Sequence, residues 1–348
     1  MDPRLALPVN AILDGNYKIA RVVGAGGFAV TYEAEDLLLR KKVAVKEYYP
    51  IDYGDRDATR RILPKSQVHT TTFEWGRSNF LEEARTLARL EHPSIVRVLR
   101  VFEANSTAYM VMNFEDGHSF ETWLRSLHRA PTQQELDAII APLLDALDLI
   151  HSSGILHRDI APDNIIIRTD GSPVLLDFGA ARWADAAAGR GFTGVVKAGY
   201  SPPEQYTFNC RLQGPWSDFY ALGGTLYRAV TGQPPEEAML RLDNDCMATA
   251  AKAANGKYRP GFLGAIDACL EVRYSDRPQS GKMLRSLLFG HRLWQAGGRL
   301  RALACSINPA AAWHWIASAA TVMVLLGGHG GVEFTRSQTA DKAGRRLR

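Results

Sequence analysis

Two short segments, HRDIAPDN at 157–164 and LLDFG at 175–179, constrain this chain more than any other feature of its sequence. The stretch between Asn164 and Asp177 has the pattern of two short strands joined by an Asp-Gly turn. A hairpin brings its two ends together, so the sequence predicts that Asn164 and Asp177 meet at one point.

The side chains expected at this point indicate a particular chemistry. Amide and carboxylate oxygens such as those of Asn164 and Asp177 are ligands that Mg²⁺ prefers. Asp159, on the loop before Asn164, could accept the proton of a hydroxyl group. The alternative is a coincidental group of loop carboxylates, and the order and spacing of the motifs argue against it.

A glycine-rich segment, VVGAGGFAVTYEA, lies much earlier, at 22–34. Glycines in a strand–turn–strand allow backbone N–H groups to close over phosphate oxygens without an obstructing Cβ. The segment is not a P-loop, because no GK[ST] follows it and no helix begins there. An ordinary tight turn is the alternative.

Lys46 lies one strand later, in VAVKEYY, and Glu83 lies in a helix predicted at 79–90. Phe80, Glu83 and Leu87 share one helix face, which directs the carboxylate towards the packed side. A strand lysine is ordinarily exposed. A buried Lys–Glu pair is costly unless it has a use, and holding the lysine on nucleotide phosphates would be one.

The hydrophobic pattern changes after Gly117 from strands to helices, which predicts an α+β fold with a strand-rich unit before a larger helical one. Strand-like runs at 17–48 and 92–114 flank a polar, irregular loop at 51–77 and the helix that follows it. Helical runs at 133–154 and 216–232 follow, each ending at a glycine.

Composition excludes several classes of protein. A hydrophobic content of 46% rules out a disordered or collagen-like chain. A net charge of +4 gives no reason to expect a nucleic-acid partner. The cysteines form no CxxC motif, so no zinc or redox site is expected. Residues 1–16 lack a long apolar run and are expected to form a short extended leader rather than a secretory signal.

In this order, the motifs resemble the eukaryotic-like (Hanks-type) protein kinases, and KEYYP and GYSPPEQY resemble a bacterial serine/threonine branch. The resemblance covers about residues 17–285 and implies a bilobal fold, with a small antiparallel-sheet N-lobe at about 17–115 and a mostly helical C-lobe at about 116–285. The matching positions are Gly24, Gly26, Val30, Lys46, Glu83, the HRD at 157–159, Asn164, the DFG at 177–179, the PPE at 202–204, Asp218 and Arg277.

The resemblance implies ATP and Mg²⁺, with Mn²⁺ as an alternative ion, in the cleft between the lobes. Lys46 would bind the α- and β-phosphates and pair with Glu83. Asn164 and Asp177 would hold the metal, and Asp159 would orient the substrate hydroxyl and take its proton. In the C-lobe, Arg277 would pair with Glu204, and Asp218 would support the catalytic loop.

The resemblance also implies a nucleotide-binding set. Its expected members are Val23, Gly24, Gly26, Gly27, Phe28, Val30, Ala44, Lys46, Met112, Asn113, Phe114 and Ile166. Met112 would be the gatekeeper and 113–115 the hinge that reads the adenine edge. Val30, Ala44 and Ile166 would sandwich the purine, with plain core packing as the alternative for these apolar residues.

Three positions depart from the family pattern. Ala29 replaces the third glycine of the loop. Ala161 stands where serine/threonine kinases place a lysine, and Asp163 stands where tyrosine kinases carry an arginine, which disfavours a tyrosine kinase. Lys197 occupies the place of a family threonine, and we hypothesise that it supplies the cation that Ala161 lacks. A solvent-facing loop lysine is the alternative.

The expected function is transfer of the γ-phosphoryl group of ATP to Ser or Thr of proteins, the chain itself included. Thr193 is the preferred regulatory phosphosite, with Ser201 as another, and Arg158 is the expected partner of the added charge. A nucleotide-binding pseudokinase scaffold is the alternative, motivated by Ala29 and Ala161. A small-molecule kinase is disfavoured by GYSPPEQY.

The C-terminal part suggests a membrane anchor. Residues 309–328 carry no formal charge and are long enough to cross a bilayer, after a linker at 286–308 and before a polar tail at 329–348. A buried or surface-lying helix is the alternative. With such an anchor the kinase domain would face the cytoplasm at the inner membrane, where ATP is found.

Overall fold

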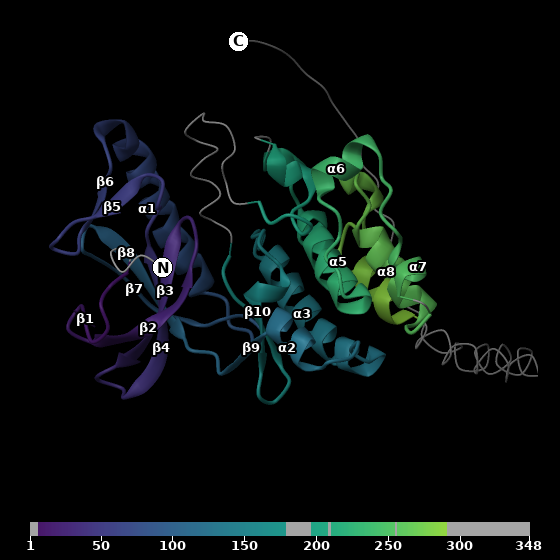
Figure 1. Ribbon diagram of the computed structural model, residues 1–348, viewed down its shortest axis with the longest axis horizontal. Helices are drawn as coiled ribbons and strands as arrows, with labels where there is room; N and C mark the ends of the chain where they lie inside the picture. Colours follow the sequence, from purple (N-terminus) through teal and green to yellow (C-terminus); the bar gives the residue numbers. More distant parts are fainter. Residues whose placement is uncertain (1–5, 179–195, 208–209, 255, 291–348) are drawn as a thin grey trace, which may run out of the picture. The chain divides into compact units, whose positions relative to one another are not determined.

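The first part of the chain folds around a six-stranded antiparallel sheet of order β1-β2-β3-β4-β8-β7. The computed structural model describes residues 6–178, 196–207, 210–254 and 256–290 (Figure 1). The strands are β1 (Ile12–Leu13), β2 (Tyr17–Ala25), β3 (Ala29–Asp36), β4 (Lys41–Tyr48), β7 (Val98–Ala104) and β8 (Thr107–Asn113). The strands predicted within 17–48 and 92–114 are confirmed.

The segment at 51–77, predicted to be an irregular loop, is only partly irregular. It contains a hairpin of β5 (Gly54–Arg56) and β6 (Ile62–Pro64), and α1 (Gln67–Leu87) begins well before the predicted helix. Polar side chains on the exposed face of the first turns obscured the helical period. Gly76 permits close packing of this helix, because a Cβ there would lie 2.3 Å from the Tyr48 hydroxyl.

The leader, where the structure describes it, is part of the fold rather than a separate extension. Leu7, Ala11 and Leu13 are buried in the hydrophobic core. β1 pairs with β2, and the Leu7 amide donates a hydrogen bond of 3.0 Å to the Tyr32 hydroxyl. Apolar side chains and one backbone donor therefore fix the leader onto the sheet, which its prolines did not suggest.

The second part of the described chain is mainly helical, as predicted, and is drawn from blue through teal to yellow-green in Figure 1. Its helices are α2 (Phe120–Ser126), α3 (Gln133–Ser152), α5 (Pro215–Thr231), α6 (Ala238–Asp243), α7 (Ala250–Ala253) and α8 (Pro260–Cys269). Short 3-10 turns are η2 (Pro162–Asn164), η4 (Pro203–Tyr206), η5 (Cys210–Leu212) and η6 (Tyr274–Asp276). A small sheet of order β11-β10-β9 contains β9 (Gly117–Ser119), β10 (Ile165–Arg168) and β11 (Pro173–Leu175).

Helix ends in this part follow the local sequence signals. Thr132 and Glu135 form a capping box at the start of α3. Gly154 and Gly232 follow α3 and α5 with φ of +74° and +79°, the left-handed conformation that ends helices. The apolar face predicted for α3 is buried, including Leu136, Ile140 and Leu144.

The predicted membrane segment falls outside the described residues, as do most of the linker before it and the tail after it. Across the described ranges, no helix is both long and apolar enough to cross a bilayer.

Candidate active site

The β10–β11 hairpin brings Asn164 and Asp177 together, as the sequence predicts. Ile165 pairs with Leu175, and the Leu176 amide donates a hydrogen bond of 2.8 Å to the Asn164 carbonyl. Asp177 has a φ of +47°, in the left-handed region that non-glycine residues rarely adopt. Such strain is retained where the surrounding structure fixes it, which is common in functional sites.

The Asn164 side chain is oriented by Asp159. Its Nδ2 donates hydrogen bonds to the Asp159 carbonyl oxygen at 2.7 Å and to Asp159 Oδ2 at 2.8 Å. Both contacts use the amide nitrogen, so Asn164 Oδ1 is left as an acceptor for another group. The hydrogen bond also fixes the Asp159 carboxylate beside the hairpin end.

Lys46 reaches across from β4 to this end of the hairpin. Its Nζ lies 2.8 Å from Asp177 Oδ1, in an ion pair and hydrogen bond. Burial alone would lower the pKa of Lys46, but the carboxylates of Asp177 and Glu83 outweigh burial and raise it. Burial alone would raise the pKa of Asp177, but Lys46 outweighs burial and holds this pKa below its ordinary value. Both groups are therefore charged at neutral pH.

The ion pair expected between Lys46 and Glu83 is not formed in this structure, because Lys46 takes Asp177 instead. Burial raises the pKa of Glu83 to about 8, with Lys46 opposing and Asp177 adding to the rise. With Lys46 bonded to Asp177, Glu83 has no ion-pair partner among the described residues, and its protonated form is favoured. Glu83 Oε1 is buried and has no hydrogen-bond partner among the described residues.

Asp218, at the start of α5, fixes the backbone of the loop that carries Asp159. This fully buried carboxylate accepts hydrogen bonds from the His157 amide at 2.9 Å and the Arg158 amide at 2.7 Å. His151 Nε2 lies 2.8 Å from Asp218 Oδ2. Burial alone would raise the pKa of Asp218, but these donors outweigh it and lower the pKa. Arg158 meanwhile adopts a φ of +66°.

A second buried carboxylate, Glu204 on η4, anchors the segment that returns to the loop. Arg277 donates to its two oxygens at 2.7 and 3.1 Å, and the Ser217 hydroxyl donates at 2.7 Å. This is the contact that the resemblance implies. Gln205, next in sequence, donates a hydrogen bond to the Arg158 carbonyl. Each buried charge is thus paired, as such groups must be.

Lys197 lies beside the catalytic loop. Its Nζ is 3.1 Å from Asp163 Oδ2, and its amide donates to the Ser201 hydroxyl. Its charge is one of those that lower the pKa of Asp177, after those of Lys46 and His157. Lys197 is therefore half-buried near Asp163 and Asp177 and does not simply face solvent. Ser201 is buried, whereas Thr193 lies outside the described residues.

Most of the expected nucleotide-binding residues lie on strands of the six-stranded sheet, on the glycine loop between β2 and β3, and on the segment that follows β8. Ala44 pairs with Met112 and Lys46 with Met110 in the β4–β8 register, and Val30 is fully buried. In the glycine loop, a Cβ at Gly26 would meet no atom within 4 Å. Gly27 and Phe28 belong to the same turn, whereas Gly24 and the exposed Val23 lie at the end of β2 that leads into it.

The expected hinge is fixed at both ends. The Asn113 amide donates to the Arg97 carbonyl at 2.9 Å. Glu115 pairs with Arg168 on β10 at 2.7 Å, and Lys42 lies over the Phe114 ring. Ile166, the residue expected under the purine, lies on β10 opposite Val174. These contacts connect the strand-rich and helical parts next to the site.

The sequence analysis missed one buried cluster beside Lys46. Glu47 is fully buried and accepts hydrogen bonds from the Tyr32 and Tyr109 hydroxyls, each at 2.6 Å, while Arg56 of β5 pairs with it. The available signal was an acidic residue on a strand whose neighbours are mostly apolar. Its partners come from β3, β8 and the inserted hairpin, so no local pattern could identify them.

The donor set fits a hard divalent cation. Asn164 Oδ1 and the second oxygen of Asp177 are oxygen ligands, as Mg²⁺ prefers. Within the described ranges, no three His, Cys, Asp or Glu side chains are grouped so that they could hold a metal ion. An ion at this point would therefore take its other ligands from water or from substrate phosphates, which is the usual arrangement for Mg²⁺.

Comparisons with known proteins agree with this geometry. A family model described as the protein kinase domain matches residues 17–289. The chain is 33% identical over 242 residues to the serine/threonine-protein kinase PknA of Mycobacterium tuberculosis, covering 68% of this chain and 50% of that protein. It is 30% identical over 295 residues to the serine/threonine-protein kinase pkn2 of Myxococcus xanthus, covering 81% and 33%. The chain thus spans a third to a half of these relatives.

A solved structure, described as the apo form of PpkA-294, has the same fold. It is 35% identical to this chain with a TM-score of 0.74, and the match covers 82% of this chain and 99% of that one.

Proposed function

Because the chain belongs to the protein kinase family, in its Hanks-type bacterial serine/threonine branch, we propose that it transfers the γ-phosphoryl group of ATP to serine or threonine hydroxyls of proteins, itself included. One observation carries the proposal: the hairpin and the catalytic loop bring Asp159, Asn164 and Asp177 to one point, with Lys46 bonded to Asp177.

Asp159 is the proposed base. A general base must reach the hydroxyl proton in a defined orientation. The hydrogen bond from Asn164 and the support of the loop by Asp218 provide that orientation. Little covalent chemistry is required in phosphoryl transfer, so fixed positions and fixed charges account for most of the catalysis.

Asn164 and Asp177 would hold Mg²⁺, or Mn²⁺, which supplies charge neutralisation for the phosphates when bound. Lys46 would then turn from Asp177 to the phosphate oxygens. Glu83, buried with one oxygen unpartnered, is the group proposed to hold Lys46 in that position. The open space at Gly26 supports the proposal that the glycine loop approaches the phosphates.

The proposal is tested by transfer of labelled γ-phosphate from ATP and Mg²⁺ to the full chain and to a generic basic protein, with phosphoamino-acid analysis of the product. Asp159→Asn should abolish transfer to Ser and Thr. Asp243→Asn, an exposed aspartate on α6, is the matched control and should transfer normally. Absence of transfer by the unmodified chain, with nucleotide bound, would overturn the proposal and favour the pseudokinase alternative.

Lys197 is proposed to replace the lysine missing at Ala161. The ion pair with Asp163 and the effect on Asp177 support this role. Removing a charge that stabilises the phosphoryl transition state should cost at least about tenfold in kcat. Steady-state kinetics should show this loss for Lys197→Ala and partial recovery for Lys197→Arg. A loss below about threefold would remove the idea.

Regulation and location remain proposals from the sequence. Thr193 as a phosphosite, with Arg158 as partner of the phosphate, is testable by phosphopeptide mapping of active enzyme. The membrane anchor at 309–328, with the kinase domain facing the cytoplasm, is testable by fractionation of cells that produce the chain. Both segments lie outside the described residues.

A further inference from the structure

A basic pocket lies on the helical part of the molecule, away from the residues assigned above. Its volume is about 330 Å³, and its lining comes from α2, the segment before α3, the last turn of α5, and α7 with the segment after it. Four of the thirteen lining residues are Arg or Lys and none is Asp or Glu. The basic residues are Arg125, Arg129, Arg228 and Lys257.

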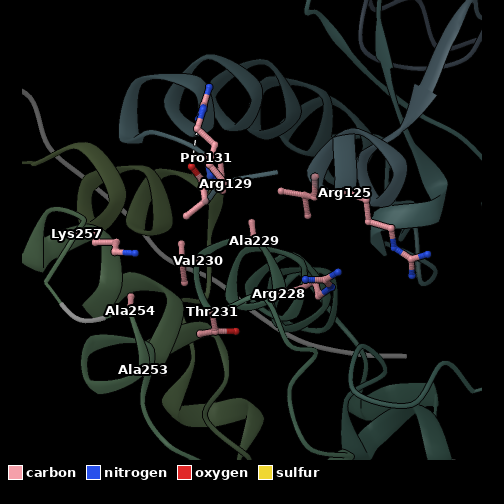
Figure 2. A pocket seen from close by; sticks show the side chains of 13 residues that line it. Arg125, Arg129, Pro131, Arg228, Ala229, Val230, Thr231, Ala253, Ala254 and Lys257 are labelled. Atoms are coloured by element: carbon pink, nitrogen blue, oxygen red, sulfur yellow. Dashed lines mark hydrogen bonds between the residues drawn. The ribbon is translucent and has the colours of Figure 1, made fainter. Parts of the chain in front are cut away.

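The floor and the rim of the basic pocket differ. Figure 2 shows Ala229, Val230 and Thr231 in the middle, with Lys257 on one side and Arg125 and Arg228 on the other. The centre is therefore uncharged and the rim is cationic, and the lining as a whole presents more polar than apolar surface. A ligand that fits such a pocket carries an anionic group.

Ion pairs within the protein do not neutralise the rim. Glu121 pairs with both Arg125 and Arg228, each at 2.8 Å, and Glu135 pairs with Arg129 at 2.6 Å. Lys257 is exposed and has no ion-pair partner among the described residues. Four cations thus face two carboxylates.

One effect opposes an anion here. The last turn of α5 ends in the basic pocket, and the carbonyl end of a helix carries about half a negative charge. Two uncompensated cations outweigh that charge, and Arg228 and Lys257 lie on either side of the helix end (Figure 2). The electrostatic balance therefore favours an anion.

The position of the basic pocket points to the source of that anion. α2, which supplies Arg125, packs against η2 of the catalytic loop. The Tyr200 ring lies against Gly224, one turn before Arg228 on α5. Burial raises the pKa of Tyr200 to about 12, and the charges that act on it are Glu121, Arg228 and Asp163. The basic pocket is therefore connected to the catalytic loop through α2 and to the segment that holds Tyr200 through α5.

We propose that the basic pocket binds an anionic side chain, a carboxylate or a phosphate monoester, of the protein whose hydroxyl group is phosphorylated. This inference rests on the proposed function, since it makes the pocket a second contact for the same acceptor. The acceptor enters along Asp159, and its acidic segment reaches the pocket past Tyr200 and Arg228. Charge complementarity of this kind gives selectivity among partners.

The experiment measures kinetics of the full chain with serine-containing peptides. One series carries a glutamate tract at increasing separations from the serine, a second carries phosphoserine in its place, and a third carries glutamine. At the separation that reaches the basic pocket, the acidic peptides should show a KM about fivefold below that of the glutamine peptide, with kcat unchanged. The two acidic series distinguish carboxylate from phosphate.

Lys257→Glu is the test variant, because Lys257 is exposed and pairs with no acidic residue in the part of the chain that the structure describes. It should remove the preference for acidic peptides and leave kinetics with the glutamine peptide unchanged. Lys252→Glu, an exposed lysine on α7 that does not line the pocket and lies shortly before Lys257 in the chain, is the matched control and should keep the preference.

Three results would overturn the inference. The first is equal KM values for all peptides at every separation, and the second is loss of the preference in Lys252→Glu as well. The third is inhibition by free inorganic phosphate that is equally strong with acidic and with glutamine peptides. Fluorescence anisotropy with a labelled acidic peptide separates this inference from the proposed function. Binding that Lys257→Glu abolishes would support the pocket even if the chain transferred no phosphate. Transfer without any acidic preference would support the proposed function alone.

Discussion

Two carboxyl groups lie close to Lys46, and they differ in how many hydrogen-bond donors surround them. Glu47, next to Lys46 on β4, is saturated with donors from Tyr32, Tyr109 and Arg56. Glu83, on α1, has one oxygen with no hydrogen-bond partner among the described residues. Glu47 is fully buried, and Glu83 is half-buried with its Oε1 inaccessible to solvent, so the presence of a buried carboxyl oxygen does not by itself distinguish them.

The difference separates a structural carboxylate from a functional one. A buried charge is stable only when donors replace the water it has lost. Glu47 meets that condition and joins β3, β4, β8 and the inserted hairpin. Glu83 does not meet it and stays mostly protonated at neutral pH. We propose that this unsatisfied group is kept for Lys46, once Lys46 leaves Asp177.

Lys46→Met should break the functional side of the comparison and have the largest effect. It removes the cation that bonds Asp177, and kcat/KM for phosphoryl transfer should fall about a thousandfold. Unfolding should change little, because the Asp177 side chain is 37% exposed. Steady-state kinetics and denaturant unfolding check the two parts, with Lys41→Met on the exposed end of β4 as control. Transfer within tenfold of the unmodified chain would contradict this role.

Glu47→Gln should break the structural side. Removing one member of a buried ion pair leaves Arg56 uncompensated, and the free energy of unfolding should fall by about 3 kcal/mol. Turnover per folded molecule should stay within about twofold, because the cleft residues are untouched. Urea unfolding and active-site titration measure these quantities. If the variant unfolded like the unmodified chain, the buried network would not stabilise the fold.

The pH dependence of stability should sharpen the comparison and has the smallest effect. The pKa of Glu83 is raised in the folded protein from an ordinary 4.5 to about 8. Its contribution to stability is therefore fully present below pH 4.5 and is lost as pH rises towards about 8. Relative to Glu83→Gln, the unmodified chain should lose on the order of 2 kcal/mol across that window. Parallel curves for the two proteins would show that Glu83 titrates normally.

Much of the fold could be predicted because it depends on local patterns. The strands within 17–48, the apolar face of α3 and the β10–β11 hairpin each follow from periodicity and turn residues. The start of α1 and the hairpin at 54–64 could not, because their polar surfaces conceal the period and their packing partners are distant. The leader was missed for the same reason, since Leu7 is buried by a sheet formed later in the chain.

The candidate site also contains features that the sequence predicts and features that it does not. The meeting of Asn164 and Asp177 follows from one hairpin, so the sequence predicts it well. The partner of Lys46 depends on how α1 and the β10–β11 hairpin are placed around it, which the sequence does not show, and the pKa values of Glu83 and Asp177 follow from that placement. The donors of Glu47 come from three separate segments and needed the folded structure to be found.

The most direct test of this account compares Glu83→Gln with Glu47→Gln in one experiment that measures both unfolding and turnover. The account predicts that Glu83→Gln is at least as stable as the unmodified chain at neutral pH, where the unmodified chain has lost most of the contribution of a protonated Glu83, and that it loses at least about tenfold in kcat/KM. It predicts the reverse for Glu47→Gln, a large loss of stability with turnover retained. The account would be contradicted if Glu83→Gln lost stability as Glu47→Gln does while turning over normally.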